Sequence, residues 1–286
     1  MPERISAIII KQYEPRDKFK LKNKGDEKYM AIIKNDIPIL EYDDSQISVI
    51  MPDHEKLDFK LPEKVVFAFL GECIDDYAEN HGGKTVAEFI SITKNYPVYV
   101  IEYEGEEIGI CQAPVGSAAA VQILDWLIGY GAKIIISAGS CGTLIDLPEN
   151  VFLVPVKALR DEGASYHYLP PSRFVESDPV VLNSIKQTLN NMNLPYIECI
   201  TWSTDGFYRE TKEKIEYRKS EGCSVVEMEC ASLTACARFR GVRFGQLLFT
   251  ADSLANVDMY DEREWGNASL SKALLLCLEI VSQFHS

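Results

Sequence analysis

The sequence lacks the features of secreted and membrane proteins. Its eight cysteines include no CxxC pair and no compact disulfide-like framework, so we expect reduced thiols and a cytoplasmic protein. No apolar run reaches the ~20 residues that a membrane-spanning helix needs. The short apolar run at residues 7–10 is followed by charged residues, which is unlike a signal peptide.

Positive charge and histidine are also scarce. The chain has 29 lysines and arginines against 43 acidic residues, which gives a net charge of −14. This balance argues against non-specific binding of nucleic acids or anionic membranes, and an anionic substrate would need a local cluster of donors. The four histidines are scattered and the cysteines unpaired, so we expect no metal site.

The 286 residues are enough for one large domain with an extension. Residues 1–60 are mixed in character and dense in charge at 11–28, where we expect an irregular, solvated stretch. Short strands, which can pair as a hairpin, are expected at 31–33 and 47–50. We interpret residues 1–60 as an extension that packs on the main domain, residues 61–286, or on a neighbouring subunit.

Apolar runs and amphipathic stretches alternate along the main domain, which predicts an α/β fold. A Glu-Gly-Glu turn at 104–106 predicts a hairpin, Ser117 is the expected cap of a helix, and Gly241 is the expected end of another. The expected strands are residues 65–71, 97–103, 107–112, 133–137, 151–156 and 243–250, with a further short β-branched strand at the start of the stretch 224–232. The expected helices are 117–130, 178–192, 233–239 and 269–284.

Several residues with chemical potential come just after predicted strands. They are Gly71, the pair Gly139 and Ser140, Phe207, Glu229 and Asp252. Ligands of α/β proteins bind at the carboxyl ends of the strands, so these residues should gather around one site.

Glu227 and Glu229 lie on either side of a junction between a strand and a helix. A carboxylate at a buried junction needs a partner. The partner is either an arginine or lysine, or the two hydroxyls of a sugar. Taken alone, the ion pair is the better interpretation, so the ligand hypothesis depends on the other residues.

Four segments of the main domain carry recognisable motifs. They are residues 137–142 (SAGSCG), 161–167 (DEGASYH), 225–231 (VVEMECA) and 249–253 (FTADS). With these segments the chain resembles the nucleoside phosphorylase/nucleosidase family, which includes purine nucleoside phosphorylase, uridine phosphorylase and methylthioadenosine/adenosylhomocysteine nucleosidase. The resemblance covers about residue 62 to the C-terminus and implies a three-layer fold with a central twisted mixed β-sheet flanked by helices. It also implies a homo-oligomer, a dimer or a trimer of dimers, with active sites shared across an interface.

The resemblance assigns roles around the sugar of a nucleoside. Glu229 matches the residue that grips the 2′ and 3′ hydroxyls, and its charge would favour an oxocarbenium-like sugar. Met228 would pack under the sugar ring. Glu227 and Gly139 complete the expected substrate-binding set on this side.

Three further residues are expected near the base. Phe207 matches the aromatic residue that stacks on it, although a core phenylalanine is an equal alternative. Asp252 matches the acid that protonates purine N7, with a helix cap as the structural alternative. His167 is a candidate pocket residue from a uridine phosphorylase-like segment, and a loop histidine bonded to backbone is the alternative.

The phosphate-binding residues depart from the family pattern. Gly71 and Ser140 match, and Lys94 aligns loosely with the arginine that a neighbouring subunit contributes. Two arginines are replaced, by Asp75 and Ser137, which removes strong bidentate contacts. The nucleosidase branch lacks these arginines and uses water activated by a carboxylate near the position of Asp75.

The favoured hypothesis is a nucleoside phosphorylase with phosphate as co-substrate and no cofactor. A nucleosidase that uses water is the alternative, and a catalytically weak nucleoside-binding protein is the third. The base preference is mixed. Asp252 is purine-like and the segment around His167 is uridine-like, but Thr211 and Glu213 replace the residues that read uracil, so we expect a purine.

Overall fold

The structure is a computed structural model that describes residues 18–20 and 29–284. The strands are β1 (Lys18–Lys20), β2 (Tyr29–Ile33), β3 (Lys64–Ala68), β4 (Lys84–Ile90), β5 (Asn95–Tyr103), β6 (Glu106–Gln112), β7 (Ile134–Thr143), β8 (Phe152–Asp161), β9 (Phe174–Glu176), β10 (Tyr196–Thr204), β11 (Val225–Glu227) and β12 (Arg243–Ser253). The α-helices are α1 (Cys73–Asn80), α2 (Ser117–Gly129), α3 (Pro179–Asn191), α4 (Lys212–Ser220), α5 (Cys230–Arg240) and α6 (Leu270–Ser282). Short 3₁₀ helices are η1 (Pro38–Leu40), η2 (Ala164–His167), η3 (Phe207–Arg209) and η4 (Asn267–Ser269).

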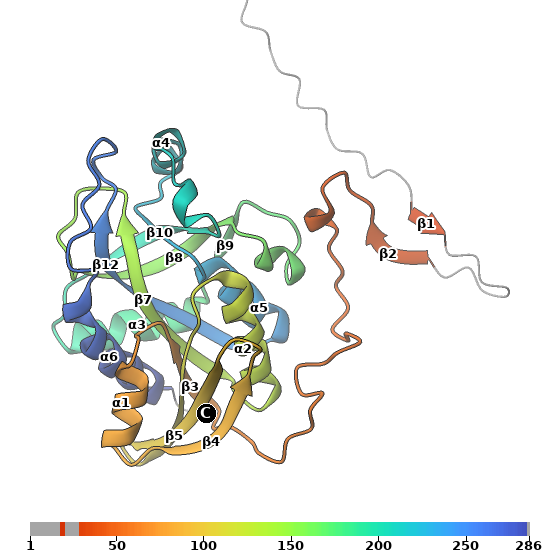
Figure 1. Cartoon of the computed structure of the whole chain (residues 1–286), viewed down its shortest axis with the longest axis vertical. Coiled ribbons are helices and arrows are strands. Elements are labelled where there is room, and N and C mark those ends of the chain that lie inside the picture. The colour runs from red at the N-terminus through yellow and green to blue at the C-terminus, as the bar shows by residue number, and fades with distance from the viewer. Residues whose placement is uncertain (1–17, 21–28, 285–286) are drawn as a thin grey trace, which may run out of the picture.

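A ten-stranded mixed sheet forms the centre of the molecule (Figure 1). Its strand order is β11-β10-β8-β12-β7-β3-β6-β5-β4, with β9 paired to β8. Strand β7 runs parallel to β3 and β12, and its last residues also pair antiparallel with β11. The strands β7, β12, β8, β10 and β11 therefore close on one another, which brings their ends together.

Helices cover both faces of the sheet (Figure 1). On one face α1, α3 and α6 pack on a core cluster that includes Val66, Ile136 and Phe249. On the other face α2 and α5 pack on a second cluster around Phe67 and Ile135. Because apolar side chains cover both faces of β3, β7 and β12, these strands are the continuous apolar runs of the sequence. This architecture confirms the predicted α/β class with its central mixed sheet flanked by helices.

Local signals in the sequence account for several element ends. Gly241 ends α5 with a φ of 71°, a left-handed conformation that favours glycine. Asp178 caps α3 by accepting hydrogen bonds from the amides of Val180 and Val181. The hairpin between β5 and β6 turns through Glu104 and Gly105, both with positive φ, as its two-residue turn requires.

Other expectations were wrong. Residues 47–50 form no strand, and the partner of β2 is β1. Most of the stretch 11–28 lies outside the described residues. Ser117 is the first residue of α2 and not its cap, because its hydroxyl donates to the carbonyl of Met228. Helices α1 and α4 and strand β4 were not predicted. The sequence of α4 is too polar to show an apolar period.

Residues 52–59 pack on the C-terminal part of α2 and on Tyr130. The ring of Phe59 stacks on Tyr130 with centroids 4.6 Å apart, and Trp126 donates to the carboxylate of Glu55. The carbonyl of Gln46 accepts from Arg240 on α5. Within the described part of the chain, no helix is both long and apolar enough to cross a membrane.

Candidate active site

A cavity of about 360 Å³ opens where β7, β11 and β12 end. Its walls combine acidic, apolar and small residues from segments that are far apart in the sequence. The lining residues are Phe69, Val115, Gly139, Ser140, Cys141, Gly142, Phe207, Glu210, Val226, Glu227, Met228, Glu229, Gln246, Asp252 and Trp265. Six residues predicted for substrate or acid–base roles therefore lie together: Gly139, Phe207, Glu227, Met228, Glu229 and Asp252.

The wall that β7 contributes is strand and not a turn. The sequence predicted a strand that ends at residue 137, with Gly139 and Ser140 after it, but β7 continues through Thr143. Gly142 must be a glycine here, because a Cβ would lie 2.8 Å from a methyl group of Leu254 and 3.2 Å from Oδ1 of Asp252. The absence of a side chain therefore allows the acid of β12 to approach β7.

Glu227 is held entirely by protein donors. Oε1 accepts hydrogen bonds from the hydroxyls of Thr201 and Ser203, and Oε2 accepts from the amides of Glu229 and Cys230. Burial raises the pKa of this carboxyl, and the four donors act against that rise. With its acceptor positions filled, Glu227 fixes the junction between β11 and α5, and it is not available to grip a sugar as the sequence had suggested.

Glu229 lies two residues further on, at the N-cap position of α5, but its side chain does not cap the helix. It accepts a hydrogen bond from the amide of Gly116. Gly116 has a φ of 100°, a backbone conformation that favours glycine. Burial, followed by the charge of Glu227, raises the pKa of Glu229 to about 8. Glu229 is 6% exposed and lines the cavity, so the remaining acceptor positions of its carboxylate are available to a ligand that enters the cavity.

Asp252 lies on β12, within the strand and not after it. Burial raises the pKa of its carboxyl, while a hydrogen bond from Tyr260 and the charge of Arg263 act against the rise. A carboxyl with a raised pKa keeps a proton at higher pH than an exposed one. Asp252 is therefore equipped to donate a proton to a ligand in the cavity.

The aromatic wall comes from η3 and from the loop before α6. Phe207 is 42% exposed and lines the cavity, so it is not a core residue. Trp265, which the sequence did not indicate, faces the same space and is 45% exposed. Exposed aromatic faces beside a cavity are surfaces on which a planar base can stack.

Glu210 is a further acid that sequence reasoning missed. It follows η3 directly and lines the cavity. Burial, followed by the charge of Asp252, raises its pKa to about 7. Its position three residues after Phe207 was the only available signal.

Four predicted residues, in addition to His167, lie outside the cavity lining. Gly71 and Asp75 are near the start of α1, where Asp75 accepts a hydrogen bond of 2.9 Å from the Tyr99 hydroxyl. Lys94 lies on the exposed turn between β4 and β5. Ser137 is fully buried on β7 with its hydroxyl unpartnered, and Ser140 is the one predicted phosphate-binding residue in the lining.

His167 belongs to a second, larger cavity of about 880 Å³. That cavity lies between residues of the 39–54 stretch, α2 and η2. It does not include Glu229, Asp252 or Glu210, so the smaller cavity is the better candidate for chemistry.

The charge of the smaller cavity is one-sided. Four carboxyl groups line it, and its described lining includes no lysine, arginine or histidine. The side-chain oxygen of Gln246, which is 5% exposed, has no hydrogen-bond partner. The described residues hold no cluster of three or more histidine, cysteine or acidic side chains suited to a metal ion.

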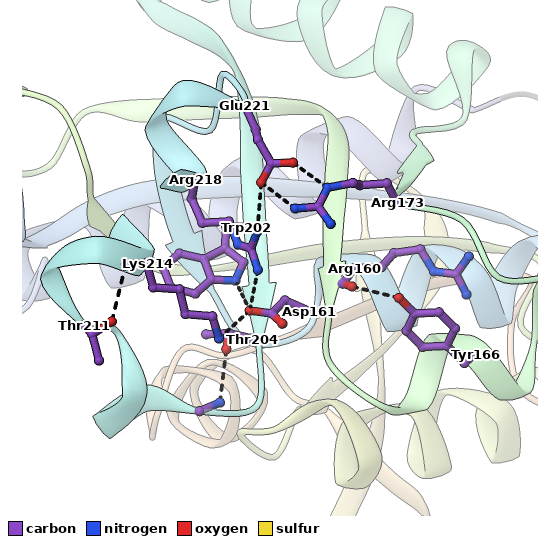
Figure 2. Close-up of polar contacts among 11 residues, drawn as sticks. Arg160, Asp161, Tyr166, Arg173, Trp202, Thr204, Thr211, Lys214, Arg218 and Glu221 are labelled. Carbon is purple, nitrogen blue, oxygen red and sulfur yellow. Dashed lines mark hydrogen bonds and ion pairs between the residues drawn. The ribbon is translucent and has the colours of Figure 1, made fainter. Parts of the chain in front are cut away.

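A network of ion pairs anchors α4, the helix that follows the aromatic wall (Figure 2). Asp161, at the end of β8, bonds Trp202 Nε1 at 2.9 Å, Lys214 Nζ at 2.6 Å and Arg218 Nη2 at 3.2 Å. Glu221 joins Arg218 to Arg173. The segment that carries Phe207 and Glu210 is thereby held between β10 and α4.

Comparisons with known proteins agree with this arrangement. A family profile described as "Phosphorylase superfamily" matches residues 64–282. A guanosine phosphorylase from Halorubrum lacusprofundi is 24% identical over 162 residues, 56% of this chain and 67% of that protein. A purine nucleoside phosphorylase from Plasmodium falciparum is 26% identical over 163 residues, 56% of this chain and 66% of that protein. The match thus spans about two thirds of these relatives.

Solved structures share the fold over a longer stretch. A uridine phosphorylase from Vibrio fischeri superposes with a TM-score of 0.69 at 23% identity, covering 78% of this chain and 93% of that one. An AMP nucleosidase from Bacteroides thetaiotaomicron gives 0.63 at 24% identity, covering 79% and 89%. The likeness at these identities concerns the fold, which hosts both phosphorolysis and hydrolysis.

Proposed function

The chain belongs to the phosphorylase superfamily, and we propose that it cleaves the N-glycosidic bond of a purine nucleoside. The observation that carries the proposal is that Glu229, Asp252 and Phe207 line one cavity together with Met228. Each matches a role that the reaction needs: a partner for the sugar hydroxyls, an acid for the leaving base, an aromatic surface and an apolar floor.

The proposed chemistry follows from the two free acids. As the bond breaks, positive charge develops on the sugar. This charge and the hydrogen bonds donated by the 2′ and 3′ hydroxyls favour the ionised form of Glu229, which in turn stabilises the sugar cation. Asp252 donates a proton to N7, so the base leaves as a neutral molecule. The buried position of each acid strengthens these interactions relative to water.

For the nucleophile, the cavity supports water. A phosphate dianion would enter a space with four carboxyl groups and no cationic side chain in its described lining. No described residue of the lining can neutralise the charge of the dianion, and any of the four carboxyl groups that is ionised repels it. Neutral groups at Gln246 and Ser140 can instead hydrogen-bond a water molecule.

Phosphorolysis is the second candidate, and two observations favour it. Curated relatives are named as phosphorylases. Lys94, which aligns loosely with an arginine that family members contribute from a neighbouring subunit, lies on an exposed turn and is accessible to a second copy of the chain. A cation supplied in this way would offset part of the repulsion.

The proposal is tested by measuring base release from adenosine, inosine, guanosine, uridine and methylthioadenosine. Wild-type protein should release purines, and Glu229→Ala should lower kcat by about 100-fold or more. Asp252→Asn should slow purine nucleosides more than uridine. Glu213→Ala, on the exposed side of α4, is the matched control and should leave turnover unchanged. Turnover of Glu229→Ala at the wild-type rate would refute the assignment.

A further inference from the structure

The carboxyl group of Glu210 has no structural role among the described residues. Glu210 lines the cavity directly after η3, and no hydrogen bond or ion pair from a described residue is found for its carboxyl group. The charge of Lys214, in the first turn of α4, lowers the pKa of Glu210. Figure 2 shows that Lys214 instead points to Asp161, where the ion pair measures 2.6 Å. Glu210 is therefore left facing the cavity.

The surroundings of Glu210 are the acid of β12 and the aromatic wall. Asp252 is near enough to raise the pKa of Glu210, which reaches about 7 because of burial first and Asp252 second. In turn Glu210 contributes to the raised pKa of Tyr260, which bonds Asp252. Apart from Lys214, the titratable groups that face Glu210 or share its cavity are Asp252, Tyr260, Cys141, Glu227 and Glu229.

We propose that Glu210 reads the substituent at position 6 of the purine and thereby decides which purines the cavity accepts. This inference rests on the proposed function, in which Asp252 contacts N7. Position 6 is next to N7 on the same edge of the base. A second carboxyl beside Asp252 therefore meets the 6-amino group of adenine or the 6-oxo group of hypoxanthine and guanine.

The two substituents require opposite partners. A 6-amino group donates hydrogen bonds and pairs with a carboxylate, whereas a 6-oxo group accepts and is repelled by one. Protonated Glu210 can donate to a 6-oxo group, and its second oxygen can still accept from a 6-amino group. Adenine should therefore bind to both forms of Glu210, while hypoxanthine needs the protonated form.

The experiment measures the affinities of free adenine and free hypoxanthine by isothermal titration calorimetry between about pH 6 and pH 8. In the wild type, hypoxanthine affinity should fall as pH rises, approaching about tenfold per pH unit above the pKa of Glu210, with adenine much less affected. In Glu210→Gln, whose amide both donates and accepts, the ratio of the two affinities should not vary with pH. Glu213→Gln is the control and should behave as the wild type.

The outcomes separate the inference from the proposed function. If the wild type binds and cleaves purine nucleosides but the adenine-to-hypoxanthine ratio is independent of pH, the inference is wrong and the function stands. The same conclusion follows if Glu210→Gln keeps the wild-type pH dependence. If the wild type binds neither base and releases none from any nucleoside, both proposals fail.

Discussion

At the scale of single residues, the site depends on two glutamates with different surroundings. Glu227 has four protein donors and organises the backbone, whereas Glu229 has one and keeps acceptor capacity for a ligand. They are two residues apart, and composition alone cannot distinguish them. What separates them is that the hydroxyls of Thr201 and Ser203 on β10 reach only Glu227.

The raised pKa of Glu229 predicts a cost in stability at neutral and alkaline pH. Its folded-state pKa of about 8 exceeds the ordinary glutamate value, so between the two the folded state holds a proton that the unfolded state has lost. The free energy of unfolding should therefore fall as pH rises from about 5 to about 8. Glu229→Gln removes this term and should melt at a higher temperature than the wild type at pH 8, although it is inactive.

Thermal melts of both proteins across this pH range measure the effect. The gain of Glu229→Gln should shrink to nothing as the pH falls below 4.5, where the unfolded carboxyl also becomes protonated. A variant that is less stable than the wild type at pH 8 would show that Glu229 is a structural residue.

The sequence predicted some residues of the cavity lining and not others. Glu229 and Asp252 could be predicted as lining residues because each lies in a short local motif, and Phe207 because it follows a predicted strand. Glu210 was missed because its environment depends on Asp252, some forty residues away in sequence. Trp265 was missed for a similar reason, since its loop reaches the cavity only after β12 has joined the sheet.

At the scale of elements, the aromatic wall depends on how α4 is attached. This helix has a polar sequence with one fully apolar buried residue, Ile215, so packing alone holds it weakly. The ion pairs of Asp161 with Lys214 and Arg218 supply the additional attachment (Figure 2). This explains why α4 was not predicted: the partners that stabilise it lie on β8.

Removing the charge of Asp161 should loosen this attachment. Asp161→Asn should lower the free energy of unfolding by roughly 1–3 kcal/mol, less than a fully buried pair would cost because Asp161 is a quarter exposed. It should also raise KM more than it lowers kcat, because Phe207 and Glu210 lose their fixed positions.

Chemical denaturation and steady-state kinetics test this expectation. Asp258→Asn is the control, since its pair with Lys212 is exposed and should contribute nothing measurable. Equal stability and KM in the wild type and Asp161→Asn would exclude a role for the network in positioning the wall.

Strand limits were harder to predict than strand existence. The apolar runs located β3, β7 and β12, but β7 and β12 extend past them through Gly142 and Asp252. Those extra residues pair because β11 and the loop near Asp261 provide backbone partners. Such distant partners leave no mark on the local sequence.

At the scale of the whole molecule, one edge of the sheet is open. Strand β4 is the last strand in the described sheet, and Ile90 and Ile92 near its end are 71% and 103% exposed. Exposed apolar side chains on an edge strand mark an interaction surface. Lys94 lies two residues further on, so an assembly through this edge would place it beside a second copy.

We therefore expect the protein to form a homo-oligomer. Multi-angle light scattering should give a mass above that of one chain for the wild type, and a lower mass for Ile92→Glu. Glu88→Gln on the same strand is the control and should assemble normally. A monomeric wild type would remove Lys94 from consideration as a residue of a neighbouring cavity.

Product analysis of a purine nucleoside with and without inorganic phosphate tests directly whether the protein cleaves the glycosidic bond and whether water is the nucleophile. We predict base release at equal rates in both reactions, with free ribose as the sugar product, because no described residue of the cavity lining offers a phosphate dianion a cation. Release that requires phosphate and yields ribose 1-phosphate would contradict water as the nucleophile. No release of base under either condition would contradict glycosidic cleavage itself.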